Sequence, residues 1–556
     1  MSKLIGFYKD IDYYLDMFEA KADKGDYPSA FNALKMAEKL SDKYLDDEFA
    51  DINLAYAQGY AEVGRFGRSN EHFYALLKRG LAKPDCYFGL AQNLNILGRA
   101  SVANSYIKLL VESEHDIPVE EIIDAFSKMG VVQGNEKAGY GVVYSKGGDR
   151  LENAGAMLAM SNLDGAAEEL EQIDKRSEYY KRARNDLAGI YIIRKKYDKA
   201  MAKTKEALEE NANDVIALCN LYLLNYVAKN EDALFDIEQR LRAVKDMSLY
   251  ELTKTATTFC EAKKHLIGAE YLERYLKEKP YNFPYMVLLG QAYYNGGEIE
   301  KSAKVFSDMV KLDYTDPIAK YYARYVIAAK TVDPKERKPL MYSPQLPYSE
   351  TVKMYKETKI LIKNGNFEML SQEDSREREL FDWFMEYGMP QDQISLVYAL
   401  EKSNYLEKEE ELEKLLLRDD IQKSVKIAIV KSLFSCGEEE AVLVDNFRLK
   451  TVKCKTPTVF FEFPKVLMDA YYLACAMLSF IDEKKILRLV KLSTDVYTAY
   501  LNNNLDFRSY RTLAALLLSK VDDQPFAEDM YCKMLNVKPA LLAKYKNLLT
   551  NGKTSG

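Results

Sequence analysis

The chain has 556 residues, a formal net charge of −7 at neutral pH and seven cysteines. Such a length exceeds what a single hydrophobic core supports, so we expect either several domains or a solenoid in which each repeat packs on its neighbours. The acidic balance leaves no global excess of Lys and Arg to neutralise a nucleic-acid backbone or an anionic membrane surface. These values disfavour both classes of partner.

The N-terminal residues and the cysteines predict a cytoplasmic protein. Residues 1–20 carry charges where a secretory signal needs an uninterrupted apolar run. The most apolar stretch, 466–481, contains Asp469 and is shorter than the roughly 20 apolar residues that a membrane helix needs, so we expect a buried helix there. The cysteines are scattered without a CxxC motif, which is typical of buried thiols in a reducing compartment.

A period of 34 residues organises the chain up to about residue 330. Small residues such as Ala200 and Gly290 recur where two helices would cross, and large ones such as Tyr191 and Phe306 recur where a gap must be filled. A helical hairpin of this kind cannot bury its apolar face alone, so neighbouring hairpins must stack. Three frames start at Ile11, Ala50 and Pro84, and five run without a gap from Gly147, Lys181, Val215, Leu249 and Phe283, the one at Val215 being the most degenerate.

With Leu289, Gly290, Tyr293 and Phe306 at the family's spacings, the last of these frames resembles the tetratricopeptide repeat (TPR). The resemblance implies an all-α fold, a TPR α-α superhelix or solenoid over residues 1–330. In this family the first helix of each repeat lines a concave groove. The array is interrupted at about 130–146, a Gly-rich and β-branched segment that we expect to project as an extended loop or hairpin.

Residues 331–349, called the strap here, hold four prolines, which forbid a helix, together with apolar residues such as Leu340 and Tyr342. We expect the strap to connect the array to a second domain and to pack along the array; whether it occupies the groove stays open at this stage.

Residues 350–556 predict a second helical domain without the 34-residue frame. Within it, residues 405–437 resemble a single HEAT-type hairpin, and 441–454 predict a small β-hairpin that turns at Asp445 and Asn446.

The last helices leave an alternative function open. Residues 524–549 have the outline of a helix-turn-helix, with Asn536 at the turn and Lys538, Lys544 and Lys546 facing a nucleic-acid groove. Acidic residues flank these lysines, and the second helix lacks Arg, Asn or Gln to read base edges. We therefore weigh a regulator that binds nucleic acid through this segment against a closing helical pair, and favour the pair.

The sequence predicts no enzyme and no cofactor or metal. It contains no HExxH or GxSxG motif and no Cys and His spacing suited to zinc. Its three histidines, His72, His115 and His265, share no helix face, and His265 falls in a packing slot of the repeat.

The predicted function is a protein-interaction scaffold that binds a peptide or protein segment of unknown identity in the groove. The family's Lys and Asn arrangement for gripping an acidic tail is absent, so we expect an extended or helical peptide with apolar anchors. The alternatives are that the apolar groove positions are simply core, or that the partner is a second copy of the chain. The residues at the groove slots are Arg182, Asn185, Ile192, Tyr226, Tyr250, Thr253, Thr257, Gln291 and Tyr294.

Overall fold

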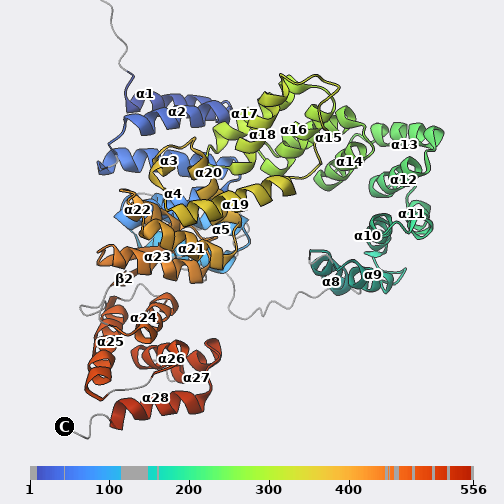
Figure 1. Cartoon of the computed structure of the whole chain (residues 1–556). Coiled ribbons are helices and arrows are strands. Elements are labelled where there is room, and N and C mark those ends of the chain that lie inside the picture. Colours follow the sequence, from blue (N-terminus) through green and yellow to red (C-terminus); the bar gives the residue numbers. More distant parts are fainter. Residues whose placement is uncertain are drawn as a thin grey trace, which may run out of the picture. The chain divides into compact units, whose positions relative to one another are not determined.

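The computed structural model describes residues 9–42, 44–113, 148–159, 162–444, 449, 451–455, 463–478, 483–503, 507–522 and 526–551. Most of these residues lie in α-helices that follow one another as antiparallel pairs, as Figure 1 shows for α10 to α17. The all-α prediction is confirmed at this level. The predicted insertion at 130–146 and the turn residues Asp445 and Asn446 lie outside the described residues.

The chain divides into two compact units, residues 1–133 with 315–317 and 348–556, and residues 134–314 with 318–347. The helices of the second unit are α8 Gly148–Ala159, α9 Leu163–Glu171, α10 Tyr180–Ile193, α11 Tyr197–Glu210, α12 Val215–Ala228, α13 Glu231–Ala243, α14 Leu249–Glu261, α15 His265–Glu278, α16 Phe283–Asn295, α17 Ile299–Leu312 and α18 Pro317–Ala329, whose first residue lies in the other unit.

The 34-residue period is visible in the backbone of the second unit. Helices α12, α14 and α16 begin 34 residues apart, at the first residue of their frames. In the four pairs from α10 and α11 to α16 and α17, the turn holds one residue in the left-handed region at the same slot, and these residues are Lys195, Lys229, Lys263 and Gly297, with φ of 57°, 56°, 60° and 86°. The repeated turn geometry returns each second helix onto its first.

Packing and caps keep the pairs in place. Gly290 of α16 faces the ring of Phe306 of α17 so closely that a Cβ would lie 2.4 Å from the ring. Asp214 caps α12 by accepting a hydrogen bond from the amide of Ala217 at 2.9 Å, and Ser248 caps α14 in a capping box with Glu251. A continuous apolar core runs from α12 to α16.

The first unit combines the N-terminal repeats with the C-terminal half of the chain. Its elements are α1 Ile11–Ala22, α2 Tyr27–Leu40, α3 Asp46–Glu62, α4 Phe66–Arg79, α5 Lys83–Ile96, α6 Ala100–Glu112, α19 Tyr348–Asn364, η1 Glu368–Ser371, α20 Arg376–Tyr387, α21 Pro390–Glu401, α22 Lys408–Leu417, α23 Lys423–Ser435, β1 Glu440–Val444, β2 Thr451–Lys455, α24 Lys465–Met477, α25 Glu483–Asn503, α26 Tyr510–Val521, α27 Ala527–Met534 and α28 Pro539–Asn551.

The two ends of the chain share one core in this unit. Tyr74 of α4 and Tyr106 of α6 both donate hydrogen bonds to the carbonyl of Leu449, at 3.0 and 2.5 Å. Leu449 and Leu417 pack in the same apolar cluster as the helices α3 to α6. These contacts explain why the compact units differ from the sequence division into 1–330, 331–349 and 350–556. A period read along the chain carries no information on which distant segments share a core.

The two strands pair antiparallel with Val444 opposite Thr451, so residues 445–450 join them. Lys426 of α23 fixes the end of β1, because its buried ammonium donates to the carbonyl of Val444 at 2.6 Å. A hydrogen bond that the periodicity could not reveal thus helps to set where the strand ends.

The last two helices have the predicted helix-turn-helix outline. Asn536 lies at the turn with φ of 53°, and Cys532, Val537 and Leu542 are buried. None of the described helices combines the length and apolar character that crossing a bilayer requires.

Candidate peptide-binding groove

The first helices of successive pairs, α10, α12, α14 and α16, position the predicted groove residues. Helix α12 contacts both α10 and α14 directly. Side chains on one face of each helix are therefore brought into a row across neighbouring repeats. Some of the predicted residues are exposed, some are buried between repeats, and one binds a segment of the chain itself.

On α10, one predicted residue is exposed and one has become structural. Arg182 is exposed and lies 3.9 Å from the carboxylate of Asp186. Asn185 is buried, and its amide nitrogen donates to Asp214 Oδ1 at 2.9 Å, the carboxylate that also caps α12. Asn185 thus joins two repeats, and we no longer expect it to contact a partner. Ile192 is half-buried.

On α14, Tyr250 is open, with 61% of its surface exposed. The hydroxyls of Thr253 and Thr257 donate to carbonyls of their own helix, at 2.9 Å to Tyr250 and 3.0 Å to Thr253. Thr253 is buried and does not line an open groove as predicted, whereas Thr257 is half-buried. Tyr226 of α12 is half-buried and packs against the core of the second unit.

Charged residues outside the predicted groove slots lie beside these positions. Burial raises the pKa of Asp186, and the positive charges of Arg182 and Lys254 offset part of this rise. Burial also raises the pKa of Glu261 at the end of α14, again opposed by Lys254. The pKa of Tyr250 is raised by burial and then by the charge of Asp186. The face of α10 and α14 therefore holds both signs of charge, and the alternation of apolar positions gave no signal for them.

Helix α16 binds a segment of the chain itself. Gln291 accepts a hydrogen bond from the amide of Ser343 at 3.1 Å and donates one to the carbonyl of the same residue at 2.7 Å. Asn295, one turn further along α16, does the same for Leu340, at 2.7 and 2.9 Å. Two amide side chains thus hold two residues of the strap through their main chain alone.

The strap is anchored between these two points by Tyr342. Its hydroxyl lies 2.7 Å from Nδ1 of His265 at the start of α15, and its ring packs against the core of the second unit. Burial raises the pKa of the Tyr342 hydroxyl. Burial lowers the pKa of His265, and the positive charge of Lys263 lowers it further. The lowered pKa favours the neutral imidazole, and which of Nδ1 and the hydroxyl donates this hydrogen bond depends on the tautomer of the ring. His265, predicted as a packing residue, is also a hydrogen-bond partner of the strap.

Tyr294 does not line an open groove as predicted. It is only 5% exposed, and its ring centroid lies 5.8 Å from that of Tyr325 in α18. Burial raises its pKa to about 12. The first helix of the next frame, α18, covers this slot, and the pattern of a single frame carries no information on what its neighbour covers.

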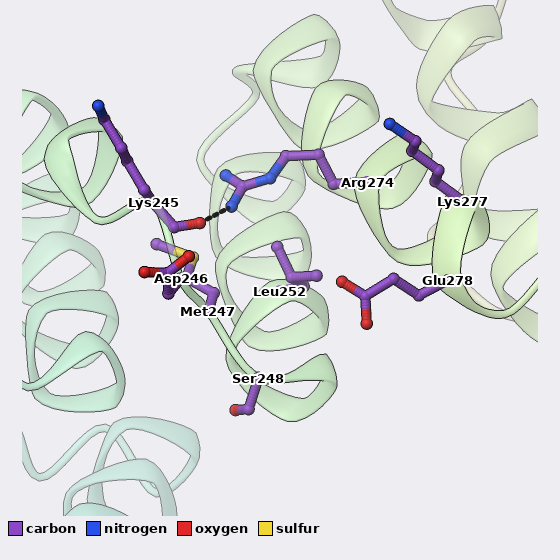
Figure 2. Close-up of a pocket in the computed structure, with 8 residues that line it drawn as sticks. All are labelled: Lys245, Asp246, Met247, Ser248, Leu252, Arg274, Lys277 and Glu278. Carbon is purple, nitrogen blue, oxygen red and sulfur yellow. Dashed lines mark hydrogen bonds between the residues drawn. The ribbon is translucent and has the colours of Figure 1, made fainter.

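A cavity of about 670 Å³ lies elsewhere in the second unit (Figure 2). Arg274 reaches across it and donates to the carbonyl of Lys245 at 2.9 Å. Figure 2 shows Leu252 and Met247 between charged side chains of both signs, and Ser248 is already engaged as the cap of α14. The predicted groove residues are not among its lining residues, which are Lys245, Asp246, Met247, Ser248, Leu252, Arg274, Lys277 and Glu278.

The described histidines are used in packing. Nδ1 of His72 lies 2.8 Å from Asn53 Oδ1, and its ring stacks on those of Tyr56 and Tyr60. His115 lies outside the described residues. Within the part of the chain that the structure describes, no three His, Cys, Asp or Glu side chains gather as metal ligands would.

Stacked helix pairs with a 34-residue period and a left-handed turn in each pair define a helical-repeat protein. No protein-family model matches the chain. It is 25% identical over 251 residues to the TPR repeat-containing protein YvcD of Bacillus subtilis strain 168, a match that covers 44% of this chain. The chain spans about half the length of that relative, 51%. In repeat spacing, in helix pairing and in sequence over these 251 residues, the chain is similar to tetratricopeptide-repeat proteins.

Solved structures of the same kind are similar at lower levels. A thermophilic TPR protein of Thermus thermophilus matches 33% of this chain and 99% of its own, with 11% identity and a TM-score of 0.27. The MamA protein matches 32% and 95%, with 18% identity and a TM-score of 0.23. The P58(IPK) TPR domain matches 58% and 99%, with 10% identity and a TM-score of 0.21. At such scores these structures carry no information on what the chain binds.

Proposed function

We propose that the chain is a non-enzymatic, cytoplasmic scaffold that binds an extended peptide or protein segment along the first helices α10 to α16. The observation that carries the proposal is the double hydrogen bonding by Gln291 and Asn295 to the main chain of an extended segment. Main-chain bonds of this kind are independent of the bound sequence, so a surface that makes them suits extended partners in general.

The neighbouring repeats supply side-chain contacts for such a partner. Tyr250 offers an exposed aromatic ring on α14, and Arg182 an exposed cation on α10. Aromatic residues and Arg are the side chains that contribute most to protein interfaces. A segment lying across α10 to α14 would meet both.

A matched pair of variants tests the proposal. Tyr250→Ala removes the exposed ring from a first helix, whereas Phe235→Ala removes a ring that is 68% exposed on the second helix α13. Both changes are at the surface, and neither should cost more than about 0.5 kcal/mol of stability. Affinity capture with mass spectrometry should return a partner with the unaltered chain and with Phe235→Ala, but not with Tyr250→Ala. Equal recovery with both variants would move the binding surface away from α14.

The alternative of nucleic-acid binding through the last two helices is weaker for a physical reason. Lys546 forms an ion pair with Glu528, and Lys533 forms one with Asp529 at 2.7 Å. These carboxylates neutralise the cations and would repel phosphates at the same place. A gel shift with the full chain tests this alternative, since salt-sensitive retention of DNA would support it. Self-association remains testable by light scattering, and a HEAT-type nature of residues 405–437 stays a prediction.

A further inference from the structure

We propose that residues 338–345 of the strap are an internal ligand of the groove, and that the partner is an extended segment with a tyrosine anchor that displaces them from α16. The inference rests on the proposed function and adds a ligand chemistry and a competition to it. The residues that contact this part of the strap form the strap seat, and they are Cys260, His265, Gln291, Asn295 and Tyr322.

The seat binds main chain at three points. Gln291 and Asn295 each take up both hydrogen-bonding groups of one strap residue, and Tyr322 of α18 donates to the carbonyl of Gln345 at 3.1 Å. Gln291 is fully buried, and its amide nitrogen also donates to the hydroxyl of Tyr322 at 3.0 Å. Release of the strap would take two hydrogen-bond partners from Gln291, and either water or the main chain of another extended segment can replace them. The seat is therefore able to exchange one extended segment for another.

Most side chains of the strap are not bound by the seat. Met341 is 85% exposed, and Pro344 and Gln345 are exposed as well. Because these side chains contribute little buried apolar area, the strap is held mainly by main-chain bonds and by Tyr342. A segment of different sequence can reproduce the main-chain bonds, and the tyrosine is the part that selects it.

The tyrosine pocket accepts a ring that carries a hydroxyl. The hydroxyl of Tyr342 lies 2.7 Å from Nδ1 of His265, and the buried thiol of Cys260 and the amide of Asn295 lie beside it. A phenylalanine in the same place would leave the half-buried imidazole of His265 without this hydrogen bond. Sites built to hydrogen-bond a hydroxyl discriminate strongly against its absence. The expected ligand is thus an extended segment with tyrosine in preference to phenylalanine.

Competition with the strap lowers the apparent affinity of such a partner. A tethered segment has an effective concentration in the millimolar range, and the partner's affinity falls by the fraction of molecules whose seat is free. Weakening the strap should therefore strengthen binding in trans, which is opposite to what loss of an ordinary structural contact would do.

The first experiment uses the labelled peptide KPLMYSPQLP, the sequence of residues 338–347, with the full chain. Fluorescence anisotropy should give binding at least about tenfold tighter for Tyr342→Ala than for the unaltered chain. Adding Gln291→Ala and Asn295→Ala to Tyr342→Ala should abolish binding of the peptide. The same peptide with phenylalanine in place of tyrosine should bind the Tyr342→Ala chain more weakly. Equal binding by the unaltered and Tyr342→Ala chains, or binding that survives loss of both amides, would overturn the inference.

The second experiment uses the unaltered chain and so does not depend on how a variant folds. The amides of Leu340 and Ser343 are protected by Asn295 and Gln291, and their hydrogen exchange reports release of the strap. A saturating excess of unlabelled peptide should accelerate exchange of residues 338–345 while the amides of α17 keep their rates. Unchanged exchange would mean that the strap is a permanent part of the fold. In that case the scaffold function, tested separately through Tyr250, could still hold.

Discussion

Exchanging a single hydrogen atom for a methyl group at Gly290 tests whether the repeat is held by close helix packing. A Cβ there would lie 2.4, 2.5 and 3.0 Å from three atoms of the Phe306 ring. That ring is fully buried and stacks on Tyr322 with centroids 5.1 Å apart, so it has no free space to enter. Overpacking of this kind costs about 1–3 kcal/mol, and the helix preference of Ala returns up to about 1 kcal/mol. We expect Gly290→Ala to destabilise the α16 and α17 pair by about 1–2 kcal/mol.

Gly189 provides the matched control, because it also lies inside a first helix but has no atom within 4 Å of its ideal Cβ. Gly189→Ala should therefore stabilise α10 by about 0.5–1 kcal/mol. Hydrogen exchange followed by mass spectrometry reads each pair locally, and 1 kcal/mol corresponds to a factor of about 5 in the exchange rate. Slower or unchanged exchange of α16 and α17 in Gly290→Ala would refute the packing argument, and adding Phe306→Leu should restore the rates if the ring is the cause.

Three further predictions concern a turn, a buried ion cluster and a histidine. Lys263 has φ of 60°, a region that costs residues with a Cβ about 1 kcal/mol or more, so Lys263→Gly should raise the free energy of unfolding by up to about 1 kcal/mol in urea denaturation. Arg378 donates at 2.7 Å to both Asp382 and Glu411, which are nearly buried. Arg378→Ala should therefore lower the free energy of unfolding, measured by tryptophan fluorescence in denaturant, by about 3–5 kcal/mol. The loss should be smaller when Asp382→Asn and Glu411→Gln accompany the change, because no unpaired buried charge then remains. The folded chain lowers the pKa of His265 below its ordinary 6.5, so the folded state binds fewer protons than the unfolded state as the pH falls. The contribution of His265 to the free energy of unfolding is therefore fully present above pH 6.5 and is lost as the pH falls toward the folded pKa. Thermal unfolding from pH 7.5 to 5.5 should show this decline in the unaltered chain and a smaller one in His265→Asn.

The repeats could be predicted from the sequence because their signal is local and recurs. Packing positions such as Gly290 and Phe306 repeat with the helix pairs, and the turn residues Lys229 and Lys263 lie one period apart although no glycine marks them. Even the degenerate frame at Val215 forms a normal pair, because Leu218 and Leu241 are fully buried and Leu221 packs against the same core. Periodicity therefore predicts helices well where neighbouring repeats impose the same packing.

Contacts between distant segments could not be predicted in this way. The carbonyl of Leu449 accepts hydrogen bonds from Tyr74 and Tyr106, more than 340 residues earlier in the chain. Such a contact leaves no spacing in the sequence, and for the same reason the compact units differ from the predicted domains. The strap's hydrogen bonds to Gln291 and Asn295 are of the same kind, since an amide has the same appearance in the sequence whether its partner is water, a ligand or the chain itself.

The slots of the repeat also explain why a groove residue must be judged repeat by repeat. Gln291 occupies the slot that Gly189, Leu223 and Thr257 occupy in the three preceding frames, so among α10, α12, α14 and α16 only α16 has an amide there. The slot of Asn295 is taken on α14 by Glu261, whose carboxylate can accept a main-chain hydrogen bond but cannot donate one. Full main-chain binding by side-chain amides at these two slots is thus confined to α16, where the strap lies. On α10 to α14 a partner would have to be held by side-chain contacts, and the two parts of the groove should differ in what they select.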